Sequence, residues 1–230
     1  MTNTKTKLLN NWYQIKHQWF EKMFKNRFLL LMSCVFLIVA TVSFAYKGTL
    51  ITKEPSLIFF SIGKYYFNHN DYHNAIKYFK KSVELKPDFA GAYHNLGISF
   101  YYNGNINEAI NYLKKSIEIK KDYAKAHYSI ALIYYELRDF DNAAHHLSMV
   151  VQLEPNNANA HFDLAVAYAD GFRKKESSGN VALSDLEGLK EALKHYRKAE
   201  ELKPLFPNAL SNTKIVENVI VEYEKFLIVD

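Results

Sequence analysis

The chain has 230 residues and a formal net charge of +5. Six of the seven charged side chains in residues 1–27 are basic, so this segment carries the whole excess and the rest of the chain is neutral overall. A nucleic-acid-binding domain is normally basic itself, so this distribution argues against a nucleic-acid partner. The single cysteine, Cys34, excludes an intrachain disulfide.

The first predicted element is an amphipathic helix over residues 8–24. Its apolar side chains recur every three or four residues, at Leu8, Trp12, Ile15, Trp19 and Met23. A basic helix with tryptophan on its apolar face is typical of a segment that lies on an anionic membrane surface. Packing against a partner or another protomer is the alternative. We favour the membrane, because an apolar run follows directly.

Residues 28–46 contain no charge, no proline and no glycine over 19 residues. A helix of this length spans roughly 28 Å, close to the thickness of the hydrocarbon layer, so we predict a single transmembrane helix. The alternative is a cleaved signal peptide, with Ser43 and Ala45 as a small-x-small site. The preceding polar segment of 27 residues is long for a signal peptide, which favours the anchor.

The charges beside the apolar run predict its orientation. Residues 1–27, the basic juxtamembrane segment, precede it, whereas only Lys47 and Lys53 follow in the linker of residues 47–54. The positive-inside rule places the N-terminus in the cytoplasm and the remaining residues across the membrane. In a bacterium this is the periplasmic face of the inner membrane.

From residue 55 onward the sequence repeats every 34 residues. Three sets of positions follow this period: small residues at Gly63, Gly97, Ala131 and Ala165; aromatic residues at Tyr66, Phe100, Tyr134 and Tyr168; and alanine at Ala75, Ala109 and Ala143. A fixed period of this length is typical of a solenoid, and no alternating strand pattern occurs here. We therefore predict an all-α solenoid that binds a partner and catalyses no reaction.

The repeated positions resemble those of the tetratricopeptide repeat (TPR) family. The first repeat shows the family order most fully, with Phe59, Ile62, Gly63, Tyr66, Ala75, Phe79, Ser82 and Pro87. The resemblance covers residues 55–204 and implies four helix-turn-helix repeats, near 56–89, 90–123, 124–157 and 158–206. An insertion at residues 171–185 separates the two helices of the fourth repeat, and its polar composition predicts a loop.

The segments between and after the repeats have predicted roles. Asp88, Asp122 and Asn156 are the expected N-cap residues of the helices that follow them. Residues 207–230 are expected to form a C-terminal capping helix, with its regular apolar pattern over residues 215–228, because a solenoid must cover its last repeat. Whether this helix caps the solenoid, fills its groove or exchanges with a second copy stays open.

In the TPR family the first helix of each repeat lines a concave groove, and the resemblance assigns a partner-binding set here. The groove is expected to be mainly aromatic and aliphatic and to bind an apolar peptide or helix. Two of its residues, Asn95 and Lys125, match positions that clamp a terminal carboxylate, but Phe60 stands where such a clamp needs lysine. The full set is Phe60, Lys64, Phe67, His94, Asn95, Ile98, Tyr101, Lys125, Tyr128, Leu132, Tyr135, Phe162 and Val166.

The sequence offers no candidate catalytic residue. It contains no nucleophile elbow, phosphate-binding loop, zinc-protease motif or paired cysteine motif. Nine histidines are present, but no three or more of them converge as metal ligands do in the predicted repeats. His127 and His161 are expected to be packing residues. We therefore predict no cofactor, no metal and no enzyme activity.

The predicted function is a membrane-anchored scaffold or adaptor that mediates protein–protein interaction in the assembly or maturation of a membrane or envelope complex. Its partner is expected to be a protein. The alternatives are a self-assembling structural protein, in which a second copy of the chain is the partner, and a non-catalytic subunit of a membrane enzyme or transport complex.

Overall fold

The computed structural model describes residues 54–179, 181–205 and 208–228. The chain divides into two compact units, Met1–Glu54 and Pro55–Asp230, and the fold reported below is that of the second. The predicted juxtamembrane helix over residues 8–24, the predicted transmembrane helix over residues 28–46 and most of the linker lie outside the described residues. Among the helices that are described, none combines the length and the apolar character needed to cross a bilayer.

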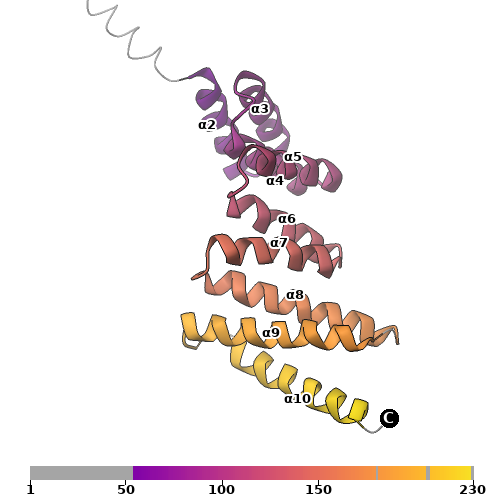
Figure 1. The fold of residues 1–230 in the computed structure, drawn as a ribbon. Helices are drawn as coiled ribbons and strands as arrows, with labels where there is room; N and C mark the ends of the chain where they lie inside the picture. Colours follow the sequence, from indigo (N-terminus) through magenta and orange to yellow (C-terminus); the bar gives the residue numbers. More distant parts are fainter. Residues whose placement is uncertain (1–53, 180, 206–207, 229–230) are drawn as a thin grey trace, which may run out of the picture. The chain divides into compact units, whose positions relative to one another are not determined.

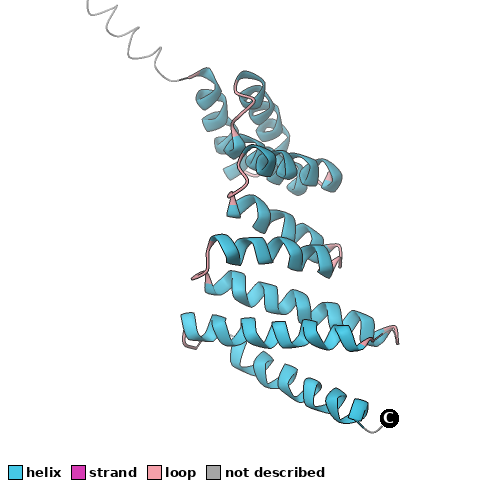
Figure 2. Ribbon diagram, viewed as in Figure 1, coloured by secondary structure: helices cyan, strands magenta, loops and turns pink. Residues whose placement is uncertain are grey.

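Helices account for all regular structure in the described ranges, which contain no strand (Figure 2). They form four antiparallel pairs, called repeats 1 to 4, and one final helix. Each helix packs against the next along the chain, so the repeats stack in sequence order (Figure 1). The pairs are α2 (Pro55–Asn68) with α3 (Tyr72–Leu85), α4 (Ala90–Tyr102) with α5 (Ile106–Ile119), α6 (Ala124–Glu136) with α7 (Phe140–Leu153) and α8 (Ala158–Ser177) with α9 (Leu183–Leu202), followed by α10 (Ala209–Ile228).

The turn inside each of the first three repeats uses one residue with a positive φ at the same position. These residues are Asn70 (φ 59°), Gly104 (φ 82°) and Arg138 (φ 58°), spaced by the 34-residue period. Asparagine and glycine adopt this conformation readily, whereas arginine does so at a cost. The repeated backbone conformation therefore fixes the same reversal between the helices of these three repeats.

Side-chain caps occur at the starts of several helices. Asp71, Asp139 and Asn157 each accept a hydrogen bond from a backbone N–H three residues further on, over 3.0–3.2 Å. The predicted caps at Asp88, Asp122 and Asn156 are wrong by one residue, because the N-cap positions are Phe89, Tyr123 and Asn157. Of these three only Asn157 caps through its side chain, since Phe89 and Tyr123 have no acceptor in reach.

The two helices of repeats 1 and 2 approach closely at a glycine. A Cβ atom on Gly63 would lie 2.7 Å from the ring of Phe79, and one on Gly97 would lie 2.7 Å from Cγ of Leu113. Phe79 and Leu113 are fully buried. The periodic small residues found in the sequence thus leave room for the large core side chain of the second helix, four residues beyond the periodic alanine.

The insertion in repeat 4 is mostly helical, and the predicted loop is wrong. It lengthens both helices of the repeat, since α8 and α9 have 20 residues each against 13 or 14 in the helices before them. Phe172, Leu186 and Leu189 are buried within the extension, so its few apolar residues do pack. Asp185 closes the turn by accepting hydrogen bonds of 2.7 Å from the ammonium of Lys175 and from the backbone N–H of Ala182.

The last helix, α10, begins six residues before the apolar pattern at residues 215–228 and packs on α9. Its buried side chains are Ala209, Thr213, Val216 and Ile220. Tyr223 contacts the extension of α8, with its ring 5.3 Å from Phe172 and its hydroxyl 2.8 Å from Glu176. This position covers the last repeat, as expected of a cap.

Candidate functional site on the first helices of the repeats

The predicted partner-binding residues lie on α2, α4, α6 and α8, the first helices of the repeats. We call the surface that bears them the A-helix face. On α6 the predicted residues Tyr128, Leu132 and Tyr135 are four and three residues apart, a spacing that places them on one side of a helix. Leu132 is 43 % exposed, whereas both tyrosines are half-buried. Leu132 thus offers apolar surface between two polar aromatic side chains.

Hydrogen bonds with a constant sequence separation join neighbouring first helices across this face. Each links residues 35 apart, one more than the repeat length: His94 with Ser129 (3.0 Å), Tyr101 with Glu136 (2.5 Å), Tyr128 with Asp163 (2.7 Å) and Tyr135 with Asp170 (2.5 Å). The tyrosine hydroxyls donate to carboxylates, which makes these bonds stronger than neutral ones. We call the four contacts the inter-repeat bonds.

The carboxylates of the inter-repeat bonds were missed by sequence reasoning. Glu136, Asp163 and Asp170 each directly follow a position that the family pattern places in the groove. The 34-residue period alone pairs identical positions, whereas adjacent helices contact each other with an offset of one residue. The A-helix face is therefore more acidic than the predicted aromatic and aliphatic groove.

Burial and, for the tyrosines, the inter-repeat bonds shift the pKa values of these residues. The pKa of Tyr101 is raised to about 12 by its hydrogen bond to Glu136, and that of Tyr135 to about 12 by burial and the bond to Asp170. Burial also raises the pKa of Asp163. Burial, with Lys125 nearby, lowers the pKa of His94 to about 4. At neutral pH the tyrosines are therefore protonated and His94 is uncharged.

Two hollows open on this face. The first, the proximal hollow, has a volume of about 410 Å³ and lies where α4, α6 and α8 meet. The predicted residues His94, Lys125 and Tyr128 line it together with Ser129 and Asn159. Lys125 is exposed, and the hollow combines its ammonium group with hydroxyls, amides and the carboxylate of Glu154, which also accepts from the side-chain amide of Asn157. Such groups suit the polar backbone and an acidic side chain of a peptide.

The second, the distal hollow, has a volume of about 570 Å³ and lies at the far ends of α6 and α8. The predicted residue Tyr135 lines it with Glu136, Asp170, Arg173 and Lys174. Arg173 forms an ion pair of 2.8 Å with Asp170. Acidic and basic groups thus alternate here, and the hollow exists because the insertion extends α8 past the length of the other first helices.

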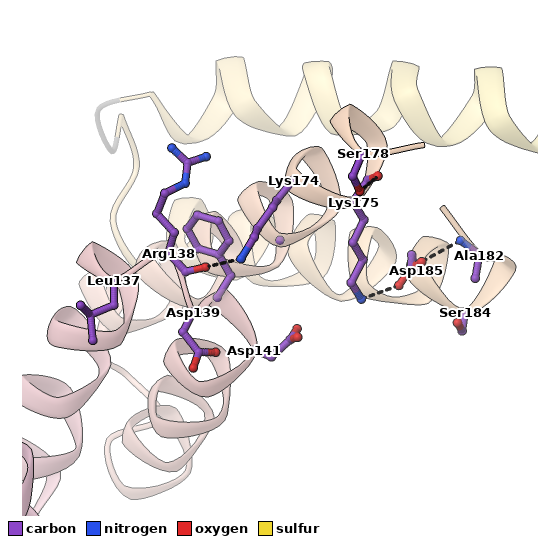
Figure 3. Close-up of a pocket in the computed structure, with 12 residues that line it drawn as sticks. Leu137, Arg138, Asp139, Asp141, Lys174, Lys175, Ser178, Ala182, Ser184 and Asp185 are labelled. Atoms are coloured by element: carbon purple, nitrogen blue, oxygen red, sulfur yellow. Dashed lines mark hydrogen bonds and ion pairs between the residues drawn. The ribbon is translucent and has the colours of Figure 1, made fainter. Parts of the chain in front are cut away.

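A third pocket, of about 670 Å³, adjoins the distal hollow and shares Arg138, Phe140 and Lys174 with it. Lys174 donates a hydrogen bond of 2.8 Å to the carbonyl oxygen of Arg138, and Lys175 reaches Asp185 (Figure 3). Arg138 and Lys174 both lie within 6 Å of the Phe140 ring centre, at 5.8 and 5.9 Å. The ammonium groups of Lys174 and Lys175 are thus both hydrogen-bonded within the protein.

The structure separates the remaining predicted residues into two groups. Phe60, Phe67, Ile98, Phe162 and Val166 are half-buried in core clusters, so much of their surface serves packing within the repeats. Phe60, for example, lies 4.8 Å from Phe89 and 5.7 Å from Phe79, measured between ring centres. Lys64 is exposed, and Asn95 donates to the carbonyl of Gly91 over 2.7 Å.

The described residues of this face do not bring metal-ligating side chains together. In the ranges that the structure describes, no cluster of three or more histidine, cysteine, aspartate or glutamate side chains could hold a metal ion. Four histidines of repeats 3 and 4 form two hydrogen-bonded pairs instead, His127 with His146 and His161 with His195. What the A-helix face offers is an exposed leucine between two polar hollows.

Comparisons with known proteins agree with the repeat architecture. The family described as tetratricopeptide repeat matches residues 128–176, and the family of anaphase-promoting complex (cyclosome) subunit 3 matches residues 68–150. No curated protein matches the chain in sequence.

Solved structures of MamA are similar to the chain. One is 26 % identical with a TM-score of 0.54, covering 69 % of this chain and 85 % of the other. A second is 24 % identical with a TM-score of 0.58, covering 75 % and 89 %. A third, MamA from Desulfovibrio magneticus RS-1 starting at its residue 41, is 16 % identical with a TM-score of 0.56, covering 74 % and 95 %. The latter two, at lower identity, show a shared fold alone.

Proposed function

The chain belongs to the tetratricopeptide repeat family, and we propose that it is a non-catalytic scaffold that holds a protein partner along its A-helix face. The observation that carries this proposal is the arrangement on α6, where exposed Leu132 lies between the proximal and distal hollows. An interface of this kind, with an apolar centre and polar surroundings, is typical of peptide recognition.

The partner segment follows from the chemistry of this face. An apolar side chain would cover Leu132, and removing that contact area from water would supply part of the affinity. An acidic side chain would pair with exposed Lys125 at the proximal hollow. The carboxylates of Asp163 and Asp170 already accept from tyrosines, so they offer less to a ligand. We therefore propose a helix or extended peptide in which an apolar residue is flanked by an acidic one.

The sequence supports placing this scaffold at a membrane. Residues 28–46 are apolar throughout and residues 8–24 are basic and amphipathic, so we propose that they anchor the chain. The charge difference across residues 28–46 supports a cytoplasmic N-terminus and a repeat domain on the far side, periplasmic in a bacterium. Such a scaffold would serve the assembly or maturation of a membrane or envelope complex.

Site-specific photocrosslinking in the native membrane tests the proposed function. A photoreactive residue replaces Leu132 in the full-length chain, and a matched control carries it at Leu85, which is 55 % exposed at the end of α3. Leu132 is a better probe than Tyr101 or Tyr135, because both tyrosines take part in inter-repeat bonds.

A discrete adduct with another protein at position 132, and none at position 85, is the expected result. An adduct with a second copy of the chain at position 132 would favour a self-assembling protein. Adducts only within one chain, or equal adducts at both positions, would overturn the proposal.

A further inference from the structure

Rings at equivalent positions join the two helices of every repeat. In repeats 1 and 2 the rings are stacked, with centroids 6.2 and 6.4 Å apart, and the pairs are Phe59 with Tyr78 and Tyr93 with Tyr112. In repeats 3 and 4 the centroids lie 5.3 and 5.0 Å apart, and the pairs are His127 with His146 and His161 with His195. The two halves of the solenoid thus use different chemistry at one structural position.

Each histidine pair shares one hydrogen bond between its Nδ1 atoms. The two nitrogens are 3.1 Å apart in the pair of His127 and His146, and 2.8 Å apart in the pair of His161 and His195. Such a bond needs one N–H donor and one free lone pair, so at least one imidazole must stay uncharged. When both rings are protonated, the bond is lost and two cations are in contact.

The surroundings of the second pair fix the position of one proton, on Nε2 of His161. His161 Nε2 lies 3.0 Å from the carbonyl oxygen of Pro155, which can only accept, so Nε2 donates. When both rings are uncharged, Nδ1 of His161 accepts from Nδ1 of His195. Two charged groups of α9 face His195: Glu191, whose carboxylate lies 3.8 Å from its Nε2, and Lys194, which opposes a positive charge.

The surroundings of the first pair, His127 and His146, disfavour a protonated imidazole more than those of the second pair do. His127 Nε2 faces the carbonyl of Lys121, the position equivalent to Pro155, but it is buried and forms no hydrogen bond in the described part of the chain. The charged or titratable groups that face this pair are His145 on α7 and Lys114 on α5, and both oppose a positive charge. Tyr134 stacks on His146 at 5.9 Å and supplies no charge.

Burial adds to these local effects. His127 and His161 are only 6 % and 7 % exposed, and the side chain of His195 is 14 % exposed. Burial lowers the pKa of His146 and that of His195 to about 4, because an imidazolium loses hydration between the helices. In the unfolded chain the same side chains would titrate near 6.5, within the range of mildly acidic compartments.

We propose that the two histidine pairs make repeats 3 and 4 acid-sensitive, so that α6 separates from α7 and α8 from α9 at mildly acidic pH while repeats 1 and 2 stay closed. The ring pairs of repeats 1 and 2 contain no group that gains a charge in this range. His94 of repeat 2 has a similarly lowered pKa, but it bonds Ser129 of α6 and is not part of the ring pair that joins α4 to α5. Since α6 and α8 carry both hollows, opening would also release a partner, a consequence that rests on the proposed function. The structural change itself does not depend on a partner.

Hydrogen–deuterium exchange of the full-length chain, resolved by mass spectrometry, tests the proposal. Exchange is compared at about pH 7 and about pH 5 after correction for the intrinsic effect of pH. We expect protection of α6, α7, α8 and α9 to fall at least about tenfold more than that of α2, α3, α4 and α5, since a tenfold change corresponds to one pKa unit. Equal losses in both halves would overturn the proposal.

The tyrosine pair of repeat 2 supplies the design of a control variant without the histidine pairs. Replacing both pairs by the rings of repeat 2, with His127→Tyr, His146→Tyr, His161→Tyr and His195→Tyr, removes the titrating groups and leaves His94 in place. The selective loss of protection is expected to vanish. A loss that persists in this variant would count against the proposal.

A titration of the wild-type chain by histidine NMR does not depend on how the variant folds. We expect His146 and His195 to stay uncharged until the repeats open and then to gain protons together with the loss of helix contacts. Titration of His146 and His195 near the ordinary histidine pKa, with the fold intact, would overturn the proposal. Partner release is measured separately through the crosslink at position 132, so failure of the scaffold proposal leaves the acid response testable.

Discussion

The hydroxyl of Tyr128 on α6 lies 2.7 Å from a carboxylate oxygen of Asp163 on α8, and this contact joins repeat 3 to repeat 4. Both residues are half-buried. Tyr101 and Tyr135 make the same kind of contact, each with a carboxylate 35 residues further along the chain. The A-helix face is therefore held together by bonds between repeats, and two of the tyrosines that donate them, Tyr128 and Tyr135, also line the proximal and distal hollows.

Breaking this contact should weaken the joint between repeats 3 and 4. Tyr128→Phe removes the donor and leaves Asp163 half-buried without its partner, so we expect the free energy of unfolding to fall by about 1–2 kcal/mol. Denaturant unfolding of the full chain measures this, and the double-mutant cycle with Asp163→Ala, which removes the acceptor, isolates the coupling. Tyr65→Phe, at a side chain that is 60 % exposed, is the control and should be neutral. Equal effects of the two tyrosine variants would contradict the interpretation.

The close approach of α4 and α5 at Gly97 gives a second prediction. Gly97→Ala places a Cβ 2.7 Å from Leu113 Cγ and 3.0 Å from the backbone oxygen of Ala109. The helices must move apart, and we expect a loss of about 1–3 kcal/mol in the free energy of unfolding. Gly188→Ala is the matched control, because it is also helical but has its nearest neighbour at 3.9 Å. It should gain up to about 1 kcal/mol from helix propensity. A neutral Gly97→Ala would show that Leu113 can shift freely.

Buried serine hydroxyls tie the two helices of repeats 1 and 2 together. Ser116 donates a hydrogen bond of 2.8 Å to the carbonyl of Ala90, and Ser82 bonds Ser56 in the same way. We expect Ser116→Ala to lower the free energy of unfolding by about 1 kcal/mol. Thermal unfolding against Ser61→Ala, whose exposed hydroxyl bonds only within its own helix, checks this. No difference between these two variants would rule out a contribution from the buried bond.

The histidine pairs predict how the melting temperature depends on pH. The pKa values of His146 and His195 are about 4 in the folded chain, below the ordinary value of 6.5. Between these values the unfolded chain binds more protons, so stability falls as the pH drops from 6.5 to 4 and these groups add no further loss below that. We expect a loss of the order of 2–3 kcal/mol per pair.

Melting curves across this range, for the wild-type chain and the four-tyrosine variant, check the prediction. Burial raises the pKa of Asp163, which acts in the opposite direction at the acidic end of the range, but Asp163 is present in both chains. Parallel dependence on pH in the two chains would contradict the assignment to the histidine pairs.

The 34-residue period predicted the repeats, because packing requires the same small and large side chains at the same positions each time. The resemblance to the TPR family assigned His94, Lys125 and Tyr128 to one surface, and in the structure all three line the proximal hollow. The period could not give the inter-repeat bonds, since these connect unlike positions in neighbouring repeats.

The 34-residue period also could not predict the length of α8 and α9. The insertion at residues 171–185 is rich in serine and lysine, and the buried residues in it and just after it, Phe172, Leu186 and Leu189, are too few to show a helical period. Their burial depends on α10, whose Val216 and Ile220 join the same core cluster. Contacts between distant segments of this kind are decided by the tertiary structure.

The offset of one residue in the inter-repeat bonds has a mechanical consequence. A solenoid can bend elastically where neighbouring repeats meet, and the inter-repeat bonds restrain this bending on the A-helix face. A ligand that drew Asp163 or Asp170 away from its tyrosine would break that inter-repeat bond and lower the bending stiffness between repeats 3 and 4. Ligand binding to the A-helix face would then change the elasticity of the solenoid. Force–extension curves of single molecules, recorded with and without a bound peptide, would measure this change.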